Sequence, residues 1–118
     1  MGPRQVNAVL AAGAVAAQCG TAFLRCQESG AHPLHKAALA DPRYTTTALT
    51  RAFSGRQARG IVNRVMRETP EAAILPFPLQ NVLTRPLRTE AARQGRAEFL
   101  SLWAGQGLRM APGTASPC

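Results

Sequence analysis

The first two dozen residues place the strongest constraint on the fold of this chain. Pro3 opens a stretch whose apolar residues recur at helical spacing and which stops at Gly13, a pattern typical of a helix. A run of small, apolar residues over 15–18 follows and ends at the turn Gly20–Thr21, which predicts a buried strand of a parallel sheet or barrel. Helix, strand and glycine turn in this order form the second half of a βαβ unit, whose first strand would lie before Met1.

Shorter elements are predicted in the rest of the chain. They are helices over 34–40, 61–67 and 97–103, and a strand over 44–50 that continues through 52–53 to a glycine turn. Several prolines interrupt the chain after residue 69. Residues 75–78 are therefore expected to be extended, and any helix resumes near Leu79 or after Pro86.

Length and composition indicate one globular domain or a piece of one. Of the 118 residues, 46% are hydrophobic and 17% charged, which leaves enough apolar material for a core. The formal net charge of +8 permits acidic or phosphorylated partners. Part of this charge comes from a basic stretch of five arginines, Arg51, Arg56, Arg59, Arg64 and Arg67. Only Tyr44 and Phe53 place aromatic rings near them, so a solvated face with salt bridges is a better interpretation than a nucleic-acid interface.

An uncharged stretch over 6–24 has the length of a membrane span, but its composition argues against one. Alanine and glycine dominate it, and Asn7 and Gln18 interrupt it. A signal peptide is disfavoured as well, because Gln18 rather than a small residue precedes Cys19 and Arg4 is the only charge near the start. We therefore expect a cytoplasmic protein with no membrane partner.

The tetrapeptide Gln18-Cys19-Gly20-Thr21 comes where the predicted parallel strand ends, which is where α/β folds bind ligands. Backbone amides of a glycine turn can approach a phosphate closely, and a threonine hydroxyl adds a donor. No histidine is adjacent to Cys19, so a buried thiol is favoured over a nucleophile.

Two histidines, His32 and His35, lie three residues apart. Because Pro33 separates them and no third ligand has suitable spacing, ordinary hydrogen bonds are predicted and no metal site. The chain holds no self-sufficient catalytic set.

Five segments in the same order resemble the C-terminal part of the nitronate monooxygenase family, formerly called 2-nitropropane dioxygenases. The segments are AAQCGTAFL over 16–24, ESGAHP over 28–33, LTRAFSGRQARG over 49–60, PLQN over 78–81 and SLWAGQG over 101–107. The resemblance implies an FMN-dependent TIM barrel that oxidises alkyl nitronates with O2. Such a barrel needs roughly 250 residues, so this chain would supply a C-terminal fragment of it.

The expected fold is therefore α/β, a C-terminal fragment of an FMN-binding TIM barrel plus its added α/β cap segment. Residues 1–24 would form the last helix-strand unit of the barrel with the phosphate turn, 25–98 the cap over the substrate, and 99–118 the return to the barrel and the tail. By position, the resemblance implies that Gln18, Cys19, Gly20 and Thr21 hold the FMN phosphate. It also implies that the turn over 103–106 returns towards the flavin.

The family's catalytic histidine would lie on an earlier strand, and neither His32 nor His35 occupies its motif, so no catalytic residue is assigned. Phe77 stands where many relatives have tyrosine, and the lost hydroxyl would alter the substrate pocket. The chain alone is expected to be inactive. It is also expected to self-associate, because Val6, Val15 and Phe23 would face strands encoded upstream.

Two other functions stay open from the sequence. An FMN-dependent enoyl-acyl-carrier-protein reductase shares the barrel and would consume nicotinamide cofactor. An arginine-rich nucleic-acid-binding module would need no FMN, and its binding would weaken steeply with salt.

Overall fold

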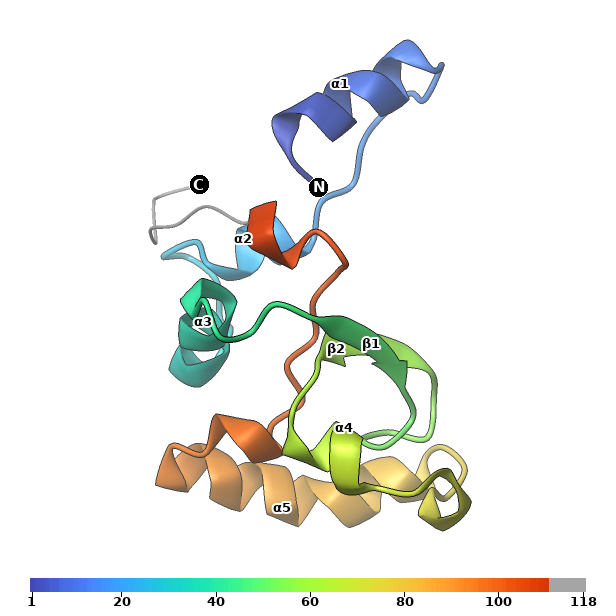
Figure 1. Cartoon of the computed structure of the whole chain (residues 1–118), viewed down its shortest axis with the longest axis vertical. Helices are drawn as coiled ribbons and strands as arrows, with labels where there is room; N and C mark the ends of the chain where they lie inside the picture. Colours follow the sequence, from blue (N-terminus) through green and yellow to red (C-terminus); the bar gives the residue numbers. More distant parts are fainter. Residues whose placement is uncertain (111–118) are drawn as a thin grey trace.

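Two short antiparallel strands organise the centre of the chain, of which the computed structural model describes residues 1–110 (Figure 1). Strand β1 (Thr47–Thr50) pairs with β2 (Ala58–Ile61), with Thr47 opposite Ile61. On the other side of β2, Trp103 forms an isolated antiparallel bridge with Gly60. The sheet thus has two strands, and the chain around Trp103 lies along the free edge of β2.

The helices agree only in part with the sequence predictions. They are α1 (Pro3–Ala11), α2 (Thr21–Leu24), α3 (Pro33–Ala40), α4 (Arg64–Glu68) and α5 (Leu79–Gln94), with single 3-10 turns η1 (Glu71–Ala73), η2 (Ala97–Phe99) and η3 (Leu108–Met110). The helix predicted over 34–40 is confirmed. The one predicted over 97–103 is limited to η2, because residues 102–104 instead run beside β2. None of the helices in the described part of the chain combines the length and apolar character that crossing a membrane requires.

Strand β2 was not predicted, and Ile61 was assigned to a helix that begins only at Arg64. The reason is tertiary. A Cβ atom added to Gly60 would lie 3.1 Å from the Leu102 carbonyl oxygen and 3.2 Å from the Trp103 ring, so the glycine makes room for the neighbouring segment. In the sequence, Gly60 indicates an interruption of secondary structure, because the segment that packs against it is distant in the chain.

Helix α5 holds the loop that follows β1. Its buried side chains Gln80 and Thr84 donate hydrogen bonds to the carbonyl oxygens of Ala52 and Phe53, the former at 2.7 Å. These bonds satisfy backbone groups that the loop leaves without strand partners. The helix continues through Pro86 and ends at Gly95, whose φ of +72° is the left-handed conformation that glycine adopts at a helix end.

The core divides into two clusters on either side of the return segment, residues 101–107. The larger joins the sheet to α3 and α5 through Ala38, Leu39, Ile61, Ala91, Leu100, Leu102, Ala104 and Leu108. The smaller contains Ala52, Phe53 and Val65, against which Trp103 packs. Asn63 is completely buried near both clusters, donates to the Leu100 carbonyl oxygen at 2.7 Å, and accepts from the Met66 amide at the start of α4.

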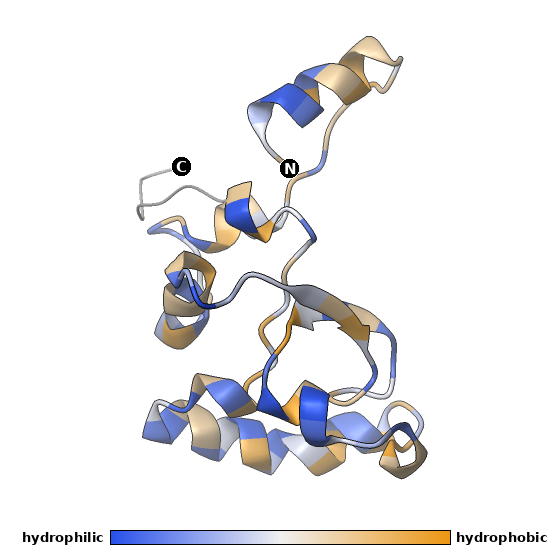
Figure 2. Cartoon of the chain, in the orientation of Figure 1, coloured by the Kyte–Doolittle hydropathy of each residue, from blue (hydrophilic) through white to orange (hydrophobic). Residues whose placement is uncertain are grey.

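The predicted buried strand over 15–18 is wrong for the described residues. They carry no strand hydrogen bonds, and the Val15 side chain is fully exposed. A parallel strand exists only with neighbours, and among residues 1–110 no strand lies beside this segment. Helix α1 is present as predicted but buries no residue and stands apart from the body of the molecule (Figure 1). It carries apolar residues along part of its length (Figure 2), of which Leu10 is exposed. The predicted last unit, 99–118, is described as far as Met110, and its remainder lies outside the described residues.

Candidate functional site

The candidate phosphate turn lies at the start of α2. Gln18 and Gly20 are exposed, Cys19 is half-buried, and no heavy atom lies within 4 Å of a Cβ atom built on Gly20. Among the hydrogen bonds of residues 1–110, the amides of Gly20, Thr21 and Ala22 have no acceptor, as is usual for the first turn of a helix. An open glycine and free amides are the donor set that suits a phosphate group, so these residues fit the phosphate of a nucleotide cofactor.

Thr21 is joined to the far end of the chain. The Gly105 amide donates to Thr21 Oγ1 over 2.9 Å, a contact between residues 84 positions apart. The return segment thus reaches the candidate phosphate turn. The segments 16–24 and 101–107, both of which resemble the nitronate monooxygenase family, are thus in direct contact.

The return segment is itself held from two sides. Towards β2, the Ile61 amide donates to the Leu102 carbonyl oxygen at 2.8 Å, and the Ala104 amide donates to the Arg59 carbonyl oxygen at 3.2 Å. Towards α3, His35 Nε2 lies 2.9 Å from the Trp103 carbonyl oxygen. The Trp103 ring meets the Phe53 ring edge-on, with 5.5 Å between the centroids. These contacts fix the position of Gly105 relative to Thr21.

Both histidines make ordinary hydrogen bonds, as predicted. His32 Nδ1 accepts from the Leu34 amide at 3.1 Å and caps α3. His35 faces a carbonyl oxygen, which only accepts, so Nε2 carries the proton of a neutral ring or one proton of a charged ring. Burial lowers the pKa of His35, and the hydrogen bond to Trp103 opposes that shift, so the neutral ring is favoured near pH 7. The partner of His35 lies 68 residues away, and no local sequence signal indicates it.

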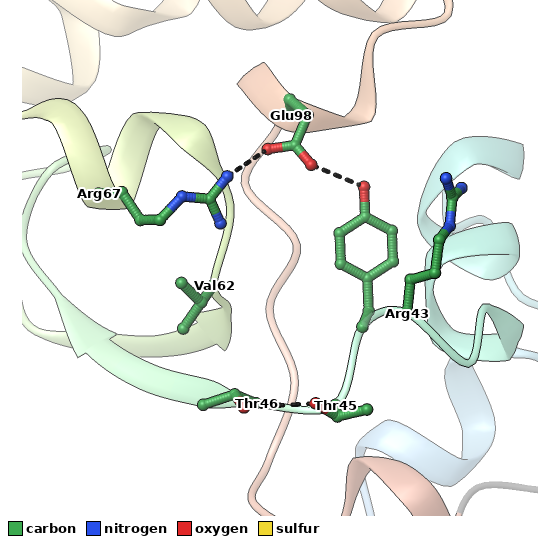
Figure 3. A pocket seen from close by; sticks show the side chains of 7 residues that line it. Arg43, Thr45, Thr46, Val62, Arg67 and Glu98 are labelled. Atoms are coloured by element: carbon green, nitrogen blue, oxygen red, sulfur yellow. Dashed lines mark hydrogen bonds and ion pairs between the residues drawn. The ribbon is translucent and has the colours of Figure 1, made fainter.

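A polar pocket of about 300 Å³ lies between the approach to β1, helix α4 and turn η2 (Figure 3). It is lined by Arg43, Tyr44, Thr45, Thr46, Val62, Arg67 and Glu98. The Glu98 carboxylate accepts from the Tyr44 hydroxyl at 3.2 Å, the Arg64 amide at 2.7 Å and the Arg67 guanidinium at 3.2 Å. Burial, together with the Glu98 carboxylate, raises the pKa of Tyr44. The carboxylate therefore joins three elements, a structural role that the sequence analysis missed.

The basic stretch is used within the molecule. Arg51 pairs with Glu71 at 3.0 Å, Arg64 with Glu68 at 2.9 Å and Arg67 with Glu98. The other two make different contacts. The Arg56 guanidinium lies 4.0 Å from the centroid of the Phe77 ring, and Arg59 donates to the Thr47 carbonyl oxygen. The expected salt bridges are thus present for three of the five arginines, while a single helix face is not formed, because only Arg64 and Arg67 lie on α4.

Comparison with known proteins gives one consistent family. The family model described as nitronate monooxygenase matches residues 1–116. The chain is 48% identical over 108 residues to a probable nitronate monooxygenase of Bacillus subtilis, covering 90% of this chain and 31% of that protein. It is 40% identical over 114 residues to the nitronate monooxygenase of Pseudomonas aeruginosa, covering 94% of this chain and 32% of that protein.

A solved structure agrees with the sequence comparisons. The nitroalkane oxidase from Streptomyces ansochromogenes superposes with a TM-score of 0.91 at 54% identity, over 99% of this chain and 33% of that one. The chain thus spans about a third of the length of the relatives it matches. Neither the enoyl-acyl-carrier-protein reductase nor the nucleic-acid-binding module gains support from these matches. A match of the family model to nearly the whole chain, with relatives and a solved structure in agreement, shows that the chain belongs to the nitronate monooxygenase family.

Proposed function

We propose that this chain supplies the flavin-phosphate turn and the cap of an FMN-dependent nitronate monooxygenase, an oxidoreductase that oxidises alkyl nitronates with O2. The observation that carries the proposal is the hydrogen bond between Gly105 and Thr21. It joins the return segment to a turn whose amides are open to a phosphate. FMN supplies the redox chemistry when bound, and the protein supplies position and electrostatics.

In this proposal Gln18, Cys19, Gly20 and Thr21 form the phosphate site. The amides of Gly20 and Thr21 and the Thr21 hydroxyl donate to phosphate oxygens, and the exposed Gln18 and half-buried Cys19 complete the turn. The two histidines are committed elsewhere, His32 to the cap of α3 and His35 to Trp103. The base that removes a substrate proton therefore comes from the rest of the enzyme, and the chain alone is inactive.

The proposed organisation keeps the three predicted units. Residues 1–24 belong to a TIM barrel, 25–98 to the cap and 99–118 to the return. The uncovered apolar side chains of Val15 and Phe23 support this division, because both lie in the unit that would pack against barrel strands. The proposed protein acts in the cytoplasm on a small nitronate.

A hybrid enzyme tests the proposal. Residues 1–118 replace the matching third of the Bacillus subtilis relative, and FMN content and O2 uptake with an alkyl nitronate are measured. We expect stoichiometric FMN and nitronate-dependent O2 uptake. The isolated chain should not retain FMN in equilibrium dialysis, because one turn offers no walls for the isoalloxazine ring. Consumption of nicotinamide cofactor without nitronate oxidation would favour the reductase instead. A hybrid that folds and binds no FMN would contradict the proposal.

A further inference from the structure

The return segment has an edge that no strand covers in the described part of the chain. The Leu102 carbonyl and the Ala104 amide both point to β2, where they are hydrogen-bonded. Because backbone groups alternate along an extended segment, the carbonyl of Trp103 between them points the other way, towards α3. There His35 Nε2 donates to it at 2.9 Å. A side chain thus supplies the donor that a further strand would have supplied.

The Trp103 side chain is also held in place. Its ring lies against Gly60, where any Cβ atom would come within 3.2 Å of the ring, and it meets the Phe53 ring edge-on. His35 is the one side chain in the described residues that bonds the outward carbonyl. Without it, the part-buried Trp103 carbonyl loses its side-chain donor, and the Ala104 amide of the same peptide group remains as the backbone anchor on β2.

Two residues later the same backbone reaches Thr21. The Gly105 amide donates to Thr21 Oγ1 at 2.9 Å, and this bond fixes the role of the hydroxyl. A hydroxyl that accepts from an amide retains one proton to donate. The Gly105 amide therefore occupies one side of Thr21 Oγ1, and the hydroxyl proton of Thr21 points away from that amide. The contact is exposed, so an external acceptor can reach it.

We propose that His35 is a positioning residue for phosphate recognition: by holding the Trp103 carbonyl it keeps the Gly105 amide on Thr21 Oγ1, and so directs the Thr21 hydroxyl proton to a phosphate oxygen of the flavin. The inference rests on the proposed function. Its distinctive consequence is that His35 affects recognition of the phosphate and not of the isoalloxazine ring.

The test measures the affinities of the hybrid enzyme for FMN and for riboflavin, which lacks the phosphate. His35→Ala removes the donor, and His35→Gln restores an amide donor near the position of Nε2. Thr21→Val removes the hydroxyl while keeping the shape of the side chain. His32→Ala is the matched control, because it weakens the start of the same helix without touching Trp103. Hydrogen exchange of a peptide spanning 103–107 follows the Gly105 amide together with the Ala104 amide that is bonded to β2.

We expect His35→Ala to weaken FMN binding about tenfold, the scale of one hydrogen bond to a charged acceptor, and to leave riboflavin binding unchanged. Exchange of the 103–107 peptide should accelerate, and His35→Gln should recover most of both effects. Thr21→Val should show the same loss of preference for FMN, and His32→Ala should show none.

Two results would overturn the inference while leaving the proposed function intact. In the first, His35→Ala keeps the wild-type preference for FMN over riboflavin while Thr21→Val loses it. In the second, His35→Ala and His32→Ala weaken both flavins equally, as general destabilisation would. A wild-type hybrid with no preference for FMN over riboflavin would overturn the phosphate site itself.

Discussion

Gly55 lies against the backbone of Phe77 so closely that a Cβ atom on Gly55 would come 2.5 Å from the Phe77 amide nitrogen. The φ of Gly55 is +88°, a conformation that side chains rarely adopt. The turn after β1 and the residues before α5 therefore pack backbone to backbone, and residues 77–78 there form a turn instead of the extended chain predicted over 75–78. Arg56 and Phe77 cover the same junction, with the guanidinium over the ring.

This contact predicts that Gly55→Ala destabilises the fold by more than about 2 kcal/mol, because the methyl group meets backbone atoms that cannot move aside. Gly95→Ala is the matched control. It also has a positive φ but no atom within 4 Å of its added Cβ atom, so about 1 kcal/mol is expected. Denaturant unfolding of the hybrid enzyme measures both. Equal losses would show that the close approach has no energetic consequence.

The buried amide of Asn63 gives a second prediction. Asn63→Ala leaves the Leu100 carbonyl oxygen without its donor at 2.7 Å and removes the cap of α4, so a loss of about 2–3 kcal/mol is expected. Asn81→Ala removes a bond from Arg88 at a less buried site and should cost under about 1 kcal/mol. The same unfolding experiment compares the two variants. A smaller loss of stability for Asn63→Ala than for Asn81→Ala would show that the buried hydrogen bonds of Asn63 do not stabilise the core.

The phosphate turn predicts different effects of two neighbouring substitutions. Gly20→Val should release FMN from the hybrid enzyme, because a side chain would fill the open space in front of the free amides. Cys19→Ala should retain FMN, because the thiol is half-buried beside the turn. Flavin absorbance after gel filtration reports both. Release by Cys19→Ala with retention by Gly20→Val would mean that the roles of the two residues are wrongly assigned.

The burial of His35 predicts a pH dependence of stability. Since burial lowers its pKa in the folded state, the unfolded chain takes up a proton first as the pH falls below the ordinary histidine value of about 6.5. The free energy of unfolding should therefore decline between about pH 6.5 and 5, before carboxylates titrate. His35→Gln should flatten this slope. An unchanged slope in His35→Gln would remove His35 as its source.

The uncovered apolar side chains predict the behaviour of the isolated chain. Val15 and Phe23 at one end, and Val82 and Leu83 on α5, are each more than half exposed. Surfaces of this kind favour association, so sedimentation should show oligomers and calorimetry a broad transition. Val15→Thr with Phe23→Gln should reduce the association. A sharp two-state transition from a monodisperse 12.5 kDa monomer would contradict this prediction.

Local patterns predicted the elements whose boundaries depend on nearby residues. Proline at the start of α1 and α3 acts within one helical turn, so these two helices could be recognised from the sequence. The end of α5 at Gly95 is not among the sequence predictions. The family could be recognised from the sequence as well, because each of the five motif segments is a short continuous run of residues.

Contacts between distant residues could not be predicted in this way. The strand containing Gly60 depends on the approach of Trp103, and the segment at 15–18 is no strand because no partner lies beside it in the described residues. Local signals were sufficient for α1, for α3 and for the family. The contacts of His35 with Trp103 and of Gly105 with Thr21, across 68 and 84 residues, depend on tertiary packing. A hydrogen bond across such a separation depends on where packing brings the two segments, and no propensity of either segment alone contains that information.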